Sequence, residues 1–442
     1  MAEIAPLTPL RYDLSRFALE RVTAPPYDVI SAEEREALAA RDPENVVRLI
    51  LPEGEGDTKY ANAATTLASM RERGVLVRDE VPGYYRYDQT FTAAVAGGEA
   101  RRITRKGFLA AVKLSPFSER IVLPHERTLS GPKEDRLKLF RATRTNLSPG
   151  FMLYRDPSLS LDGPLGLARP VAEMITPDGV VHRLSKVVDP EALRAITSKI
   201  AESALLIADG HHRYETAVRY AGEVSEAHPG ASARAEHRYF MVFLSNGDDP
   251  GLVVFPTHRH VHSLPSFSFD DLLAGARPLF DVTLLGTRDT REMLRDLDRA
   301  GKAGPAFVAC AKDGRAALLC LRSDANLGAH PALAGLVPAL QRTDIAVLHG
   351  AILESLCGIT KEAQAAKTNL YYPQDAEKAF ADLLGGKGDV LFLMNPTPPN
   401  VVRDVAEAGE VMPQKSTFFF PKVLTGLTIH TLDPAREVPA LG

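Results

Sequence analysis

An aspartate, a glycine, two histidines and an arginine follow one another in one short stretch of the sequence. Carboxylate and imidazole groups can transfer protons, and imidazole and guanidinium groups can bind phosphate, so this combination suits acid–base or phosphate chemistry. The stretch follows the apolar residues 204–208, and apolar residues then recur at helical spacing between positions 214 and 221. The sequence therefore predicts a strand, a sharp turn and a helix. The residues at the turn are Asp209, Gly210, His211, His212 and Arg213.

A helix start is a favourable place for an anion. Its first N–H groups have no partner within the helix, and the helix dipole is positive there. We therefore expect residues 210–213 to surround an anion, with phosphate as the first candidate. The alternative is an aspartate that caps the helix beside two solvated histidines. Two histidines and an arginine in one row favour the chemical interpretation over the capping one.

The segment 24–31 is a second candidate for a site. Its two consecutive prolines stiffen the chain and hold Tyr27 and Asp28 in an extended or turn conformation. Ser31 and Glu34 have the spacing of a capping box, which predicts a helix start. A rigid loop that presents Tyr27 and Asp28 could form a wall for a substrate. In the alternative interpretation, Asp28 bonds only to its own backbone in a turn.

A third candidate is the segment 123–145, which begins as a loop and continues as a helix. Lys133 and Arg136 share a helical face with apolar residues, whereas ordinary surface helices separate the two kinds. Cations drawn toward an interior need a partner, which is either a bound phosphate or buried carboxylates. The preceding loop holds His125 and Glu126, which could supply acid–base chemistry.

Three histidines alternate in an extended segment and would share one face of a strand. They are His258, His260 and His262. Zinc binding is one interpretation, but no cysteine or carboxylate flanks them in the usual way. We favour His258 and its neighbour Arg259 as contacts for an anion.

The fourth candidate is the aromatic segment 412–422. Its polar head contains Lys415, Ser416 and Thr417, whose ammonium and hydroxyl groups suit a phosphate or carboxylate. The alternative is simply a polar start to a strand.

Composition excludes several classes of function. The 442 residues allow two or three domains, and 52 basic against 56 acidic residues give a net charge of −4, which argues against bulk nucleic-acid binding. The N-terminus lacks the pattern of a signal peptide, and no apolar run is long enough to cross a membrane. Cys310, Cys320 and Cys357 fit no metal-ligand spacing and agree with a reducing compartment. We expect a cytoplasmic protein with no membrane association. Its oligomeric state stays open.

The elements around these segments alternate between helix and strand. A break near residues 264–266 separates two parts, and we expect a mixed α/β fold with lobes at 1–264 and 265–442, in which segment 412–422 returns to the site. Expected helices cover 57–74, 189–202, 268–277 and 289–300. Two further helices are expected, one from Asp344 to near Gly358 and one starting at Asp375. Expected strands cover 83–92, 103–114, 239–245, 252–255, 305–311, 316–321, 369–372 and 390–394, with turns at 97–98 and 177–179.

Four segments together resemble the bacterial and archaeal family called domain of unknown function 1015. They are residues 25–30, 124–128, 208–217 and 412–417.

The stretch from Asp209 to Arg213 is also similar to the nucleotide-binding motif of the ParB/sulfiredoxin superfamily, which includes free-serine kinases, sulfiredoxins and CTP-binding partition proteins. This resemblance implies a ParB/sulfiredoxin-like core with large insertions. It also implies that Gly210, His211, His212 and Arg213 contact phosphate and that Asp209 acts nearby through Mg²⁺. Kinases of the superfamily use a glutamate from an early segment as base. The residues that could fill this role here are Asp28, Glu33 and Glu126.

These observations predict an enzyme that acts on a small phosphorylated metabolite by phosphoryl transfer or phosphate-ester hydrolysis, with serine or phosphoserine as the first substrate to test. ATP or ADP and Mg²⁺ are the cofactors that this chemistry would use. Two alternatives are a nucleotide-binding regulator without turnover, and a metal-dependent hydrolase built on His211, His258 and His260. The predicted catalytic residues are Asp209, His211, His212, His125, Glu126 and Asp28. The predicted phosphate or nucleotide contacts are Gly210, Arg213, Lys133, Arg136, Lys415, Ser416, Thr417, His258 and Arg259.

Overall fold

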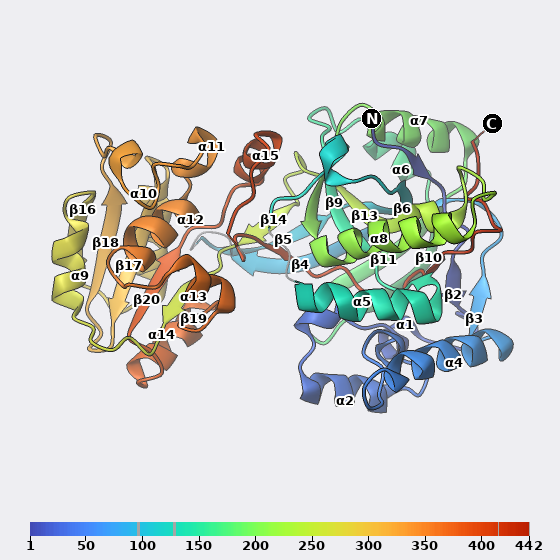
Figure 1. Cartoon of the computed structure of the whole chain (residues 1–442), viewed down its shortest axis with the longest axis horizontal. Coiled ribbons are helices and arrows are strands. Elements are labelled where there is room, and N and C mark those ends of the chain that lie inside the picture. The colour runs from blue at the N-terminus through green and yellow to red at the C-terminus, as the bar shows by residue number, and fades with distance from the viewer. Residues whose placement is uncertain (95–97, 127–129, 414, 442) are drawn as a thin grey trace.

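A computed structural model describes residues 1–94, 98–126, 130–413 and 415–441. These residues form two large sheets, and Figure 1 shows each sheet with its helices in a separate lobe. Both chain termini lie in the larger lobe. The fold is mixed α/β, as the sequence predicted.

The larger lobe contains a ten-stranded sheet of mixed direction. Its order is β10 (Arg169–Ile175), β11 (Val181–Val187), β4 (Tyr84–Ala94), β6 (Phe108–Lys113), β13 (Tyr239–Asn246), β9 (Gly150–Tyr154), β12 (Leu205–Asp209) and β7 (Val122–Leu123). β1 (Ile4–Ala5) also pairs with β6, and β5 (Ala100–Arg105) with β4. The pairs β13–β9 and β12–β7 are parallel, and the others are antiparallel.

β13 shows how this sheet is covered on both faces. Every residue of the strand is buried, and its side chains alternate between two hydrophobic clusters. Phe240 and Val242 pack with residues of α5 (Ser130–Thr143), α7 (Pro190–Ile200) and α8 (His211–Ala227). Met241 and Phe243 face the opposite way, toward the N-terminal and C-terminal segments.

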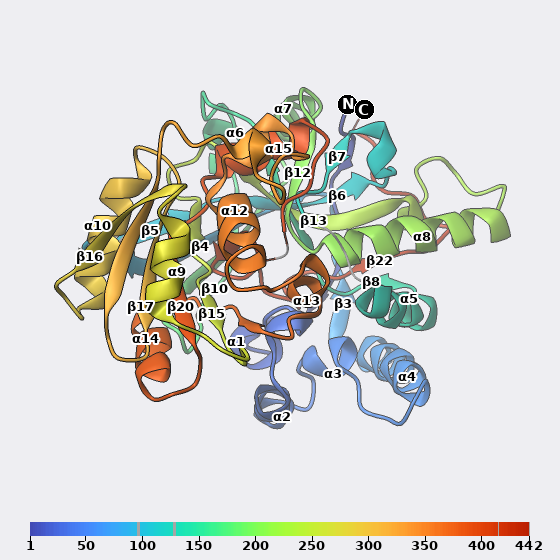
Figure 2. The same ribbon diagram turned by 60° about the vertical axis from the view of Figure 1, so that its left-hand side comes forward.

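The smaller lobe contains a six-stranded antiparallel sheet. Its order is β16 (Phe280–Leu285), β18 (Ala316–Leu321), β17 (Ala306–Ala311), β20 (Val390–Met394), β15 (Arg259–Val261) and β19 (Leu370–Tyr371). On one face, α10 (Thr290–Gly301) and α14 (Ala376–Leu384) pack on Val308 and Leu391. On the other, α9 (Phe269–Ala276) and the π-helix Leu348–Glu354 pack with Phe307 and Phe392. Figure 2 shows these helices on either side of the sheet.

The remaining elements are short or lie at the edges of the lobes. The α-helices are α1 (Leu19–Val22), α2 (Ala32–Arg41), α3 (Val47–Ile50), α4 (Thr58–Glu72), α6 (Asp162–Gly166), α11 (Pro338–Gln341), α12 (Asp344–Val347), α13 (Lys361–Ala366) and α15 (Pro399–Glu407). Three further pairs of strands are β2 (Leu10–Tyr12) with β3 (Leu76–Arg78), β14 (Val253–Phe255) with β21 (Phe418–Phe420), and β8 (Thr145–Asn146) with β22 (His430–Thr431). None of the described helices is long and apolar enough to cross a bilayer.

Two predicted elements differ from the structure. The strand expected over 103–114 is interrupted between Arg105 and Phe108. A Cβ on Gly107 in this interruption would lie 2.4 Å from the Phe243 ring, so only glycine fits there. The helix from Asp344 changes to a π-helix and ends at Glu354, before Gly358. The turn expected at 97–98 falls partly outside the described residues. The lobe boundary near 264 stays a prediction, although β15 already belongs to the second sheet.

Candidate functional site

The predicted strand, turn and helix around Asp209 are present. β12 ends at Asp209, Gly210 has a φ of +94°, and α8 begins at His211. No side chain caps the start of this helix. A Cβ on Gly210 would lie 3.0 Å from Nη2 of Arg213, so the glycine lets this guanidinium fold back over the turn. The start of α8 is thus bordered by one aspartate and one buried arginine.

Asp209 is surrounded by positive charge. Lys422 donates a hydrogen bond to its Oδ2 at 2.8 Å, and Nη2 of Arg213 lies 3.6 Å from Oδ1. Burial alone would raise the pKa of Asp209, but the charges of Lys422 and Arg213 lower it well below its ordinary value. Arg213 also donates a hydrogen bond to the carbonyl of Pro149. The carboxylate is therefore ionised and already paired with two cations.

A third cation, Arg105, is fully buried close to the same carboxylate. Its Nη2 donates to the side-chain oxygen of Gln89 and to the carbonyl of Pro421, but its Nε and Nη1 have no hydrogen-bond partner among the described residues. The guanidinium carbon lies 4.6 Å from the centre of the Phe151 ring. Burial lowers the pKa of Arg105 to about 9, while the charge of Asp209 acts in the opposite direction. Asp209 therefore pairs with Lys422 and Arg213, and its charge also acts on Arg105.

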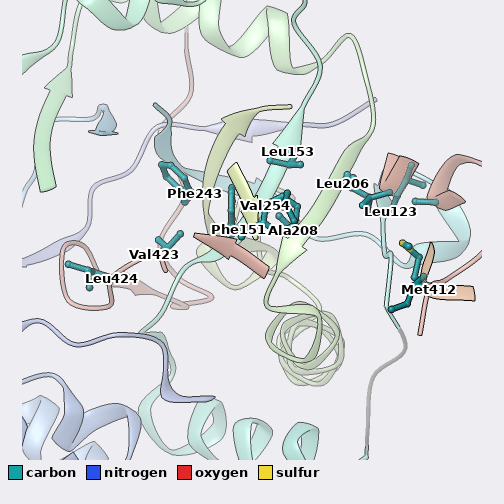
Figure 3. Close-up of a cluster of buried hydrophobic side chains, with 14 of the residues drawn as sticks. Leu123, Phe151, Leu153, Leu206, Ala208, Phe243, Val254, Met412, Val423 and Leu424 are labelled. Carbon is teal, nitrogen blue, oxygen red and sulfur yellow. The ribbon is translucent and has the colours of Figure 1, made fainter. Parts of the chain in front are cut away.

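These groups lie on an apolar layer beneath the C-terminal segment. Phe151 and Ala208 of the sheet and Val423 and Leu424 of the C-terminal segment belong to one buried cluster, which Figure 3 shows. Met412 lies in the same cluster near Leu123. This packing holds the C-terminal segment against the end of β12.

His125 connects three parts of the chain. Its Nδ1 lies 2.6 Å from the carbonyl oxygen of Ile207, so Nδ1 carries the proton and donates it. Its Nε2 is then an acceptor and lies 3.0 Å from the hydroxyl of Thr417. The backbone N–H of His125 donates to Nε2 of His211 at 3.2 Å. Burial lowers the pKa of His211 to about 3, which keeps this ring neutral.

Glu126 and Arg259 hold the two ends of one peptide group. The N–H of Ser416 donates to Oε1 of Glu126 at 3.1 Å, and Nη2 of Arg259 donates to the carbonyl of Lys415 at 3.1 Å. Lys415 is exposed and has a φ of +59°, a conformation that non-glycine residues rarely adopt. Burial would raise the pKa of Glu126, but His125, His211 and Lys415 lower it to about 2. The predicted polar head of segment 412–422 therefore lies at the site.

His258 and Arg259, which were predicted as anion contacts, have internal partners in the structure. His258 is buried and its Nδ1 accepts the N–H of Met394 at 3.1 Å. Arg259 is fully buried, and all three of its nitrogens donate to internal partners, which are Nε2 of His349, the carbonyl of Thr257 and the carbonyl of Lys415. Arg259 therefore positions the Lys415 carbonyl, and the role of both side chains as anion contacts stays a prediction.

The cations of α5 have internal carboxylate partners. Lys133 forms an ion pair with Glu215 at 2.8 Å. Arg136 bonds to Asp135 and to the carbonyl of Ile50, and its guanidinium carbon lies 4.1 Å from the centre of the Tyr27 ring. The sequence left either a bound phosphate or carboxylates as partners of these cations, and the structure gives both of them a carboxylate partner.

A small cavity of about 30 Å³ lies where three predicted segments meet, and Tyr27, Arg136 and Arg213 are among its lining residues. This volume suits a water molecule. Asp28 is exposed next to Tyr27, and its charge acts on the half-buried His212, whose pKa is lowered mainly by burial. The segment with Tyr27 and Asp28 therefore lies beside the start of α8.

The three-histidine metal site is not present. Among the residues that the structure describes, no group of three or more His, Cys, Asp or Glu side chains could hold a metal ion. His258 and His260 lie in the sheet of the smaller lobe, while His211 contacts His125 in the larger one. The interpretation as a hydrolase built on these histidines is therefore wrong.

Two charged residues of the site were not predicted. Lys422 follows the aromatic strand, and its sequence neighbours gave no sign of a carboxylate partner more than 200 positions away. Arg105 has a local signal, because it follows Ile103 at the strand spacing of two and so shares the face of a buried residue. Arg105 is a charged residue at a position where the strand pattern expects an apolar one, and this signal could have marked it as a candidate.

Comparisons with solved structures give only weak overlaps. A conserved hypothetical protein from Pyrococcus furiosus has a TM-score of 0.35 and 14% identity, over 74% of this chain and 95% of that chain. A free serine kinase in complex with AMP has a TM-score of 0.36 and 11% identity, over 74% and 92%. SbnI with a C-terminal truncation, from Staphylococcus aureus, has a TM-score of 0.36 and 11% identity, over 73% and 87%. Overlaps of this size carry no argument about function. No curated protein matches the sequence significantly.

The sequence itself matches a family over most of its length. Residues 4–346 fit the family described as "Protein of unknown function (DUF1015)". This range includes the segments around Tyr27, His125 and Asp209, whereas segment 412–417 lies beyond it. The chain therefore belongs to the DUF1015 family.

Proposed function

We propose that the start of α8 binds the phosphate group of a small metabolite or nucleotide, and that the protein acts on it by phosphoryl transfer or phosphate-ester hydrolysis. One observation carries this proposal. Arg213 and Lys422 both pair with a single carboxylate, Asp209, in a largely buried place, and the charge of Asp209 also acts on the buried Arg105, so that the cations outnumber the carboxylate. Unbalanced buried charge is costly, and a bound anion would reduce this cost.

The local geometry supports a phosphate as this anion. Among the described residues, no side chain caps the first turn of α8, so its N–H groups can donate to phosphate oxygens. Nε and Nη1 of Arg105 also need acceptors. A phosphate monoester is a dianion near neutral pH and presents three oxygens, which fits both needs. We also propose that the Asp209–Arg213 motif is a phosphate-binding motif of the ParB/sulfiredoxin type.

The acid–base chemistry is assigned to His125 and Glu126. His125 has one nitrogen fixed as a donor and the other free to accept a proton from a hydroxyl. Glu126 stays ionised at neutral pH and stabilises positive charge on the imidazole. The neutral His211 holds the backbone of this loop.

Asp209 does not suit a resident Mg²⁺ ion. Its carboxylate is paired with Lys422 and Arg213, and Arg105 adds a third cation nearby. Like charges repel, so a divalent cation would meet a positive environment there. No step of the proposed chemistry therefore uses a metal held by the protein alone.

A ligand screen tests this proposal. Thermal shift and calorimetry are measured with ATP, ADP, AMP, CTP and phosphoserine, and phosphate release or serine phosphorylation is measured in parallel. A ligand at 100 times its Kd should add about 2.7 kcal/mol of stability. Binding should fall strongly in Arg213→Met and stay unchanged in Lys387→Met, whose lysine pairs with Asp382 at the surface.

The screen also separates the two remaining functions. Turnover with serine and ATP, or with phosphoserine, would support the enzyme. Binding that needs Arg213 but gives no turnover would instead support a nucleotide-binding regulator. No binding by any phosphorylated compound would overturn the proposal.

A further inference from the structure

Thr417 and His125 have the arrangement of a hydroxyl nucleophile and its general base. The Thr417 hydroxyl lies 3.0 Å from Nε2 of His125, and Nδ1 of His125 lies 2.6 Å from the carbonyl of Ile207. A carbonyl accepts but never donates, so it fixes the proton on Nδ1 and leaves Nε2 as the acceptor. The hydroxyl proton of Thr417 therefore points at the imidazole, as in other nucleophile–base pairs.

A carboxylate stands ready to stabilise the charged imidazole. Oε1 of Glu126 lies 3.7 Å from Nε2 of His125. If Nε2 takes a proton, the ring becomes a cation next to an ionised carboxylate, which offsets the cost of charging a buried group. His125, Glu126 and the Ile207 carbonyl thus supply the orienting and stabilising parts that such a base requires.

Thr417 is the hydroxyl of this segment that is both paired with a base and partly exposed. The neighbouring Ser416 is buried, and its hydroxyl donates to the carbonyl of Pro413. Thr397 donates to the carbonyl of Ser416, which is not a base. Thr417 also lies between two lysines of the segment, Lys415 and Lys422, which can attract an anionic substrate.

We propose that Thr417 is a covalent phosphoryl acceptor, so that the reaction passes through a phosphothreonine enzyme. This inference rests on the proposed function. Thr417 Oγ1 attacks the phosphorus of a phosphate monoester, its proton passes to Nε2 of His125, and the bond from phosphorus to the leaving oxygen breaks. The leaving alcohol takes the proton from His125. Water, or the hydroxyl of a second substrate, then gives a proton to Nε2 of His125, and its oxygen attacks the phosphorus of the phosphothreonine. The bond from phosphorus to Oγ1 breaks and Oγ1 takes the proton back from His125, which restores the threonine and releases phosphate or the phosphorylated second substrate.

The experiment measures the mass of the protein during turnover. Wild-type protein is mixed with p-nitrophenyl phosphate or phosphoserine and quenched in acid within the first turnover, because phosphothreonine survives acid. The intact protein should gain about 80 Da, the mass of one phosphoryl group, and peptide mapping should place it on Thr417. Thr417→Ser should be labelled as well, since it keeps the hydroxyl.

Two variants, each of which loses one hydrogen bond, distinguish the loss of a reacting hydroxyl from the loss of a structural contact. Thr417→Val should lose the label and at least about 100-fold in turnover. Thr397→Val is the matched control, because it removes a hydroxyl that also bonds within this segment, and it should be labelled like wild type.

The outcomes are distinct for the two proposals. Turnover by wild type with no label, together with full turnover by Thr417→Val, would overturn the covalent step and leave the phosphate-processing function intact. Label on another residue would also overturn it. No turnover and no binding with any phosphorylated compound would overturn the proposed function and this inference together.

Discussion

The ion pair between Lys422 and Asp209 should be worth much more than an ordinary surface pair. Their side chains are 20% and 18% exposed, and the hydrogen bond between them is 2.8 Å long. A hydrogen bond to a charged group contributes about 1.5–3 kcal/mol, and removing one partner leaves the other poorly solvated. Arg213 stays 3.6 Å from the carboxylate and retains part of the attraction. We therefore expect a coupling energy of about 2 kcal/mol between the two residues.

A double-mutant cycle measures this energy. Urea unfolding is recorded for wild type, Asp209→Asn, Lys422→Met and the double variant. The control cycle uses Asp382 and Lys387, which are also an aspartate and a lysine, 2.6 Å apart, but are 31% and 68% exposed. That surface pair should show a coupling below about 0.5 kcal/mol.

The pH dependence of the coupling has a fixed sign. The pKa of Asp209 is lowered in the folded protein, so the stability it provides is fully present above the ordinary aspartate pKa of about 3.9 and is lost as the pH falls through the folded value. The coupling should therefore be constant between about pH 5 and 8. A coupling no larger than that of the surface pair would refute the view of a largely buried charge cluster at the start of α8.

Three further predictions follow from other parts of the structure. Gly210→Ala should lower the free energy of unfolding by more than about 1 kcal/mol and weaken phosphate binding, because it strains a left-handed turn and displaces Arg213. The control is Gly222→Ala, which lies in open space on α8 and should be neutral or stabilising. Equal effects of the two variants in thermal unfolding would contradict this. Arg259→Met should speed hydrogen exchange in residues 412–420 and leave β16 and β18 unchanged, and a uniform increase would mean general destabilisation instead. Unfolding at pH 5 should take up at least about three protons, because burial lowers the pKa of three histidines to about 3 in the folded state while the unfolded value is about 6.5. The free energy of unfolding should therefore fall as the pH drops below about 6.5. Calorimetry in two buffers with different enthalpies of ionisation measures this uptake, and equal unfolding enthalpies in both would contradict the prediction. These histidines are His211, His258 and His349.

Local patterns predicted the elements well. The capping box of Ser31 and Glu34 is present, with both of its hydrogen bonds. Residues 204–217 form the expected strand, turn and helix, because apolar period and glycine conformation are properties of neighbouring residues. The hairpin turn at 177–179 joins β10 to β11 as expected. These features depend on residues within a few positions of one another.

Partners that are distant in sequence could not be predicted in the same way. Lys133 and Arg136 were expected to need either phosphate or carboxylates, and spacing alone could not choose Glu215 and Asp135. Arg259 was expected at the anion site, but its strand lies inside a sheet whose pairing depends on segments 109 and more residues away. The sequence does not show which strand becomes a neighbour, so the burial of Arg259 followed only from the structure.

One peptide group forms a hydrogen-bonded link between the lobes. Lys415 and Ser416 share this peptide, whose carbonyl accepts from Arg259 of the smaller lobe and whose N–H donates to Glu126 of the larger lobe. A hydrogen-bonded peptide between a cation and an anion is polarised in the same direction by both, so each bond strengthens the other. Arg259 in turn bonds to His349, which donates to Gln364. A ligand contact that displaced the Lys415 carbonyl would therefore break its hydrogen bond to Arg259.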